Sequence, residues 1–190
     1  MAHDSSAWGG TPIGDRYVAA KYSEAESEQL AHDFARQAEK EHAPVVGRLR
    51  RAFGLALRDL GVDPASGFVE AIWLPSDVAA EIRPQWGRQY MDRSGELWTA
   101  LVYIAGTLRL IPEIDASNPE IHLPLFVAIA IQDRLIEEVG EPRPVCPLHP
   151  HPLEPLGTLT GPIWACPQGA QVWYCRMGTY RESSESVSRP

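Results

Sequence analysis

The pattern that decides the fold of the C-terminal part of this chain lies at residues 145–175, VCPLHPHPLEPLGTLTGPIWACPQGAQVWYC. This stretch contains all three cysteines of the 190-residue chain and two of its six histidines. Prolines are concentrated in the same region, since eight of the seventeen lie between Pro142 and Pro167. Because proline cannot continue a helix or donate to a central strand, we expect a stiff linker at residues 141–145 that leads into a separate module.

The N-terminal sequence and the apolar runs of the chain predict the cellular compartment of the protein. The N-terminal sequence MAHDSSAWGGTPIGD has neither the basic nor the apolar region of a secretory signal. The most apolar runs, LWTALVYIAG and PLFVAIAI, are shorter than the roughly 20 residues that a membrane helix needs. We therefore expect a cytoplasmic protein, in which closely spaced cysteines indicate metal ligation more than disulfide bonds.

The cysteines and histidines have the spacing of metal ligands. CPLH at residues 146–149 is followed by CPQG at residues 166–169. Two donors separated by two residues can turn back on one ion, and proline at the second position presets the turn. The pattern resembles the paired knuckles of a zinc ribbon over about residues 145–180, although Gly169 stands where the second knuckle would have its second donor. The resemblance implies a β-hairpin module with a structural zinc ion.

The fourth ligand has two candidates. A site of three thiolates and one imidazole would use Cys146, His149, Cys166 and Cys175, and this is the set that we predict. His151 is the alternative to Cys175. A third interpretation has no metal, because unligated cysteines are often buried and HPH occurs in proline-rich turns.

The remainder of the chain carries signals for both helices and strands. Ser23 followed by Glu26 forms a capping box that begins a helix, and Pro44 should end or kink it. Apolar residues at intervals of three and four predict helices at residues 44–60 and 123–139, ended by Gly61 and Gly140. A short helix should begin at Ser76. The segments FVEAIWLP, ELWTALVYIAG and TLRLIPEI, at residues 68–75, 96–106 and 107–114, favour strands, although the spacing of the apolar residues from Leu97 to Ile111 also fits a helix.

Together these signals predict an α+β fold, with helices around a small antiparallel sheet and a C-terminal zinc-ribbon-like hairpin module. The expected organisation is a flexible tail (1–22), an α+β domain (23–140), the module (141–180) and a disordered tail (181–190). Gln132 falls inside the apolar arc of its helix. We expect a buried side chain satisfied by backbone groups, with a ligand-facing role as the alternative.

Charge and motifs limit the function. The net charge of −8 disfavours a general polyanion binder, which needs clustered Lys and Arg. The zinc-enzyme patterns His-Glu-x-x-His and His-x-Glu with a later Cys-x-x-Cys are absent from the sequence. We therefore predict a non-enzymatic, zinc-stabilised scaffold that binds another protein.

Two other functions remain as alternatives. One is a zinc-dependent hydrolase or transferase with an open site at Cys146, His149 and Cys166, with Glu154 as general base. The other is a nucleic-acid-binding zinc ribbon, in which exposed aromatic side chains such as Trp173 would stack on bases.

Overall fold

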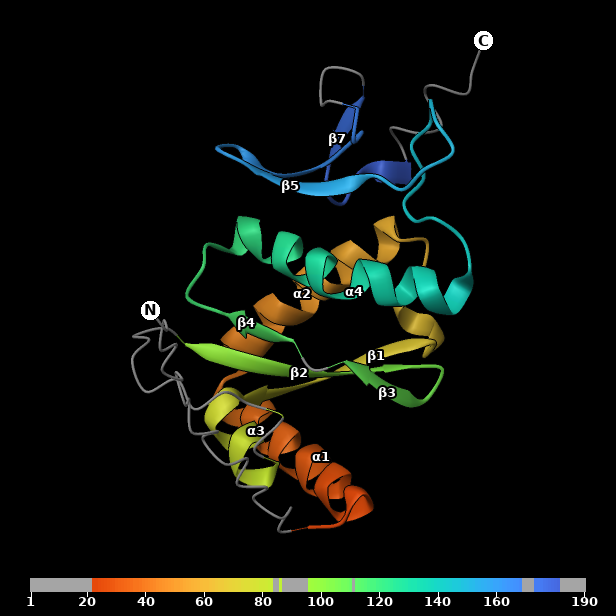
Figure 1. Ribbon diagram of the computed structural model, residues 1–190. Coiled ribbons are helices and arrows are strands. Elements are labelled where there is room, and N and C mark those ends of the chain that lie inside the picture. Colours follow the sequence, from red (N-terminus) through yellow and green to blue (C-terminus); the bar gives the residue numbers. More distant parts are fainter. Residues whose placement is uncertain (1–21, 84–85, 87–95, 111, 169–172, 182–190) are drawn as a thin grey trace, which may run out of the picture.

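The computed structural model describes residues 22–83, 86, 96–110, 112–168 and 173–181, and it stacks helices and sheets in layers (Figure 1). Helices α1 (Glu24–Glu41) and α3 (Ser76–Ile82) cover one face of a four-stranded sheet. Helices α2 (Ala43–Asp59) and α4 (Leu123–Val139) cover the other face, and a three-stranded sheet lies beyond them. The predicted α+β class is therefore confirmed. The tails predicted at 1–22 and 181–190 fall, apart from one residue each, outside the described residues.

The larger sheet is antiparallel throughout. Its strands are β1 (Val69–Pro75), β2 (Leu97–Ile104), β3 (Thr107–Leu110) and β4 (Glu113–Asp115). Strand β2 is central, because it pairs with β1 on one side and with both β3 and β4 on the other. The three predicted strands are confirmed, except that the segment at 107–114 forms two short strands. Pro112, which has no N–H to donate, falls between them.

Strand β2 is buried on both faces. Trp98, Ala100 and Val102 point into the core formed with α2 and α4, whereas Leu101 belongs to the smaller core under α1 and α3. A strand covered on both faces has a nearly continuous apolar sequence instead of an alternating one. For this reason the periodicity of residues 97–111 alone did not distinguish a strand from a helix.

The helix boundaries follow the local signals in the sequence. Ser23 accepts a hydrogen bond from the Glu26 N–H, and the Glu26 carboxylate accepts one from the Ser23 N–H, so the predicted capping box is present. Helix α1 ends at Glu41, and α2 begins at Ala43 with a proline in its first turn. Gly61 and Gly140 follow α2 and α4 with φ of 76° and 74°, the left-handed conformation that glycine adopts without strain.

The small sheet packs directly on α2 and α4. Its strands are β5 (Glu154–Thr158), β6 (Gly161–Ala165) and β7 (Tyr174–Arg176), in the order β5-β6-β7 and antiparallel. Every residue of the central strand β6 is buried. Leu153, Trp164 and Cys175 belong to the same core cluster as the apolar faces of α2 and α4. The C-terminal hairpin strands that we predicted are therefore present, and they share a core with the helices.

A buried carboxylate fastens the small sheet to α2. Asp59, only 2% exposed, accepts hydrogen bonds from Trp164 Nε1 at 2.8 Å, from the Tyr180 N–H at 3.2 Å and from the Gly178 N–H. Burial raises the pKa of the Asp59 carboxyl, and these three donors and Arg58 oppose the shift. Sequence analysis did not identify Asp59. The feature of the sequence that could have identified Asp59 is its position at the edge of the apolar arc of α2, seven residues after Ala52.

Candidate metal centre

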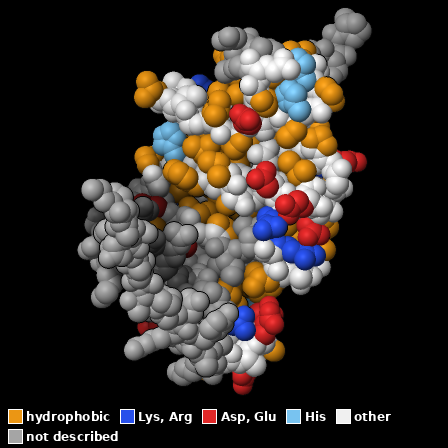
Figure 2. All heavy atoms as spheres, in the orientation of Figure 1, with side chains coloured by type: hydrophobic (Ala, Val, Ile, Leu, Met, Phe, Trp, Pro, Cys, Tyr) orange, Lys and Arg blue, Asp and Glu red, His pale blue; other side chains and the backbone are white. Residues whose placement is uncertain are grey.

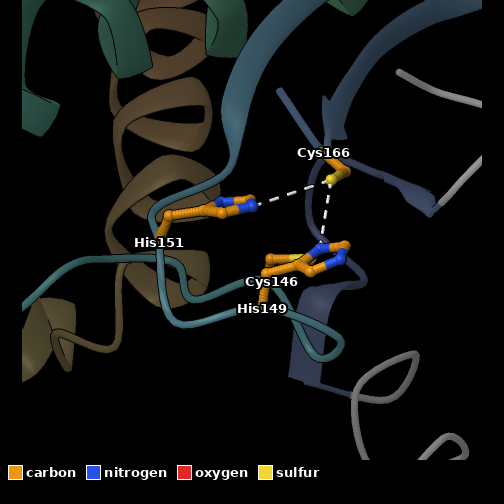
Figure 3. Close-up of side chains that lie close together, drawn as sticks. All are labelled: Cys146, His149, His151 and Cys166. Carbon is orange, nitrogen blue, oxygen red and sulfur yellow. Dashed lines mark hydrogen bonds between the residues drawn. The ribbon is translucent and has the colours of Figure 1, made fainter. Parts of the chain in front are cut away.

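A tight loop presents three of the predicted donors. The loop is closed at its base, where the Leu153 N–H donates to the Pro144 carbonyl at 2.8 Å, and again where the Cys146 N–H donates to the His151 carbonyl at 2.9 Å. The His149 N–H donates to the Cys146 carbonyl at 3.3 Å inside the loop. These bonds bring the side chains of Cys146, His149 and His151 to the same side of the loop (Figure 3).

The fourth donor comes from the small sheet. Cys166 follows directly after β6, and its N–H donates to the Trp173 carbonyl at 3.0 Å. The structure brings Cys146, His149, His151 and Cys166 together, so that one donor atom of each lies within 4.8 Å of the others (Figure 3). Both thiols are buried and both imidazoles are partly exposed. This group can hold a metal ion.

Three of the six separations between the donor atoms are close to those of a tetrahedral metal site. His149 Nδ1 lies 3.5 Å from Cys146 Sγ and 3.5 Å from Cys166 Sγ, and His151 Nε2 lies 3.8 Å from Cys166 Sγ. In a tetrahedral zinc site with its usual bond lengths, sulfur and nitrogen ligands lie about 3.6 Å apart. These three sulfur–nitrogen distances are compatible with ligands that share one ion.

A hydrogen bond favours one tautomer of the neutral His151 ring. Its Nδ1 lies 3.0 Å from the carbonyl oxygen of Pro152. Because a carbonyl only accepts hydrogen bonds, Nδ1 must carry the proton, and Nε2 keeps the lone pair that faces Cys166. Metal-bound histidines in proteins are commonly oriented by such a bond from the other ring nitrogen. The His149 ring stacks on the His151 ring, with centroids 5.2 Å apart, so neither imidazole is positioned alone.

The surroundings of Cys166 disfavour the thiolate form of its side chain. Burial raises its pKa, and the neighbouring Cys146 thiol and the charge of Glu154 raise it further, whereas the Gln168 N–H lowers it. Without a positive charge nearby, such a thiol stays protonated at neutral pH. A bound metal ion supplies that charge and stabilises the thiolate.

Helix α4 holds both ends of the ligand loop through Gln132. The Gln132 Nε2 donates to the Arg143 carbonyl at 2.9 Å and to the Leu153 carbonyl at 2.7 Å. This confirms that the glutamine is buried and satisfied by backbone groups. Since the two carbonyls flank the ligand-bearing residues, the side chain also positions the loop.

The predicted ligands divide into two groups in the structure. Cys146, His149 and Cys166 lie together, and the donor that joins them is the alternative ligand, His151. Cys175 is not in this group. It lies opposite Trp164 in the register of β6 and β7 and is buried in the core. The geometry thus favours the set with His151, and ligation by either set stays a prediction. No disulfide joins the three cysteines.

Comparison with family models, with curated proteins and with solved structures gives no match for this chain. Among the helices that the structure describes, none has both the length and the apolar character that a membrane crossing requires.

Proposed function

We propose that Cys146, His149, His151 and Cys166 bind one zinc ion. The observation that carries this proposal is that the four donors lie within 4.8 Å of one another, with three of their sulfur–nitrogen separations at 3.5–3.8 Å, close to the edges of a tetrahedral site. Two thiolates and two imidazoles in tetrahedral geometry are the donor set that zinc prefers. Ca²⁺ and Mg²⁺ prefer oxygen ligands, which this group does not offer.

The ion has a structural role in this proposal. It joins the loop at residues 146–151 to the end of β6, and so links two segments of a small module with few core residues of its own. Metal binding then adds directly to the stability of the module. A catalytic zinc keeps one position for water, whereas His151 would supply a fourth protein donor beside Cys146, His149 and Cys166.

The module serves protein binding, as a non-enzymatic scaffold. The distribution of exposed apolar side chains supports this role. Among the residues that the structure describes, eight of the ten large apolar side chains that are exposed lie between residues 121 and 174. The net charge of −8 argues against a nucleic-acid partner. The zinc ion would keep this surface in a defined shape.

The metal content of purified protein tests the site. We would measure zinc by elemental mass spectrometry on protein without a histidine tag, for wild type and for Cys146→Ser, His151→Ala and Cys175→Ser. We expect one zinc per chain in wild type and in Cys175→Ser, and loss of zinc in the other two variants. His32→Ala, on the exposed side of α1, is the matched histidine control and should keep its zinc.

The outcomes separate the alternatives. Loss of zinc in Cys175→Ser with retention in His151→Ala would show that the thiolate-rich set is the correct one. A wild-type protein without metal would refute the zinc proposal. Co²⁺ in place of zinc would report the number of thiolates through the intensity of its sulfur-to-metal charge-transfer band.

A further inference from the structure

Strand β5 runs antiparallel along helix α4, so that the two form one continuous surface. Residue numbers rise along the hairpin as they fall along the helix. Three contacts show this: the Leu153 carbonyl with Gln132, Gly157 with Leu125, and Gly161 with Ile121. The last two are close, since a Cβ on Gly157 would lie 3.2 Å from Leu125 Cδ2, and one on Gly161 would lie 3.0 Å from Ile121 Cδ1.

This surface is apolar and exposed. Figure 2 shows hydrophobic side chains gathered over α4 and the small sheet. We call it the α4–hairpin surface and define it by Ile121, Phe126, Ile129, Leu156 and Leu159. Ile129 is 56% exposed and Leu159, in the turn between β5 and β6, is fully exposed. A contiguous patch of this kind on a folded protein marks a site for a partner.

The chain has no formal charge within the segments that form this surface. Residues 121–132 and 155–165 contain no Asp, Glu, Lys or Arg, although 22% of the whole chain is charged. The centres of protein–protein interfaces are depleted of charged residues in the same way. The absence of charge therefore distinguishes this surface from the rest of the molecule.

Two exposed carboxylates adjoin these uncharged segments in the sequence. Asp133 and Glu154 directly follow Gln132 and Leu153, which are joined by a hydrogen bond, and both are exposed. Neither forms an ion pair with another described residue, whereas the glutamates further along α4 are paired with arginines. A cationic group that approached Asp133 and Glu154 would meet two carboxylates that are not ion-paired with any of the described residues.

We propose that the α4–hairpin surface binds a helical segment of another protein, with apolar side chains at intervals of three and four and Lys or Arg at the end that meets Asp133 and Glu154. The proposal rests on the protein-binding role proposed above and names the chemistry of the partner. Apolar helices in apolar grooves and faces are a common mode of peptide recognition, and the terminal charges fix the direction of the helix.

Other occupants fit less well. A strand added to the edge of β5 would find no N–H at Pro155. A second copy of the chain would bring the same uncharged segments, and it would leave Asp133 and Glu154 without a cation at the contact. An anionic membrane surface would be repelled by both carboxylates.

The test uses a synthetic peptide as the probe. The peptide has about 18 residues, or five helical turns, with leucines at intervals of three and four and lysines at one end. One control peptide has glutamates in place of the lysines, and another has the lysine sequence scrambled. Fluorescence anisotropy measures binding to wild type, to Ile129→Ser with Leu159→Ser, and to Asp133→Asn with Glu154→Gln. Phe34→Ser, a partly exposed phenylalanine on α1, is the matched control.

We expect the lysine peptide to bind wild type at least about tenfold more tightly than either control peptide. A few contacts at the centre of an interface typically produce a difference in affinity of this size. The apolar double variant should lose about tenfold in affinity. The carboxylate double variant should lose several-fold and show a weaker salt dependence. Phe34→Ser should bind as wild type does. Equal binding of all three peptides, or wild-type binding by both double variants, would refute the proposal.

Two further readouts identify other occupants and separate this proposal from the zinc site. A wild type that sediments as a dimer, together with a monomeric Ile129→Ser variant, would show that a second copy occupies the surface and would overturn the proposal. Zinc is measured on the same samples. If wild type contains no zinc but still binds the lysine peptide more tightly than the controls, only the proposed metal site is refuted. If wild type contains zinc but binds all three peptides equally, only the proposed binding surface is refuted.

Discussion

Replacing Gln132 with methionine removes the two hydrogen bonds that hold the ligand loop against α4. The amide is 7% exposed and donates to two backbone carbonyls at 2.9 and 2.7 Å. Methionine has a similar volume, so the packing changes little. Each carbonyl loses a donor in an environment where water replaces it poorly, at a cost of about 1–1.5 kcal/mol. We expect the free energy of unfolding to fall by about 2–3 kcal/mol in total.

Urea denaturation followed by circular dichroism measures this loss. With a slope of about 2–3 kcal/mol per molar urea for a chain of this size, the midpoint should fall by about 1 M. Gln37→Met is the control, because Gln37 is an exposed residue of α1 whose amide bonds only to Glu41 on the same helix. That variant should unfold within about 0.5 kcal/mol of wild type. A loss of less than about 0.5 kcal/mol in Gln132→Met would refute the assignment of Gln132 as the anchor of the loop.

Three further substitutions or treatments have defined outcomes. Since burial raises the pKa of Asp59 above its usual 3.8, the stability of wild type relative to Asp59→Asn should be greatest below about pH 4 and decrease as the pH rises through the raised pKa. Urea midpoints of both proteins from pH 4 to 7 measure this difference in stability. A difference that does not change with pH would contradict the raised pKa. Gly161→Ala should cost about 1–3 kcal/mol in thermal unfolding, because Gly161 has φ of 119° and contacts Ile121, whereas Gly47→Ala in α2 should cost nothing. A chelator should lower the melting temperature of wild type and leave that of Cys146→Ser unchanged, and equal melting curves for wild type with and without chelator would count against a structural ion.

The sequence predicted those features whose causes are local. The capping box at Ser23 and Glu26, the ends of α2 and α4 at their glycines, and the strand character of residues 97–104 all depend on neighbours within a few positions. Two of the donor positions, Cys146 and His149, belong to one short loop, so their spacing was informative as well. These features also indicated the α+β class, because each element carries its own pattern of apolar residues.

The tertiary structure alone decided which donors lie together and what holds the module in place. Cys175 is nine residues after Cys166, but the register of β6 and β7 places it opposite Trp164 and inside the core. His151 is fifteen residues before Cys166, yet its Nε2 lies 3.8 Å from the Cys166 sulfur. The three donors to Asp59 lie more than a hundred residues later in the chain. Spacing along the chain specifies local turns. Distances between remote segments depend on strand register and on how the sheet packs against the helices, which only the assembled core determines.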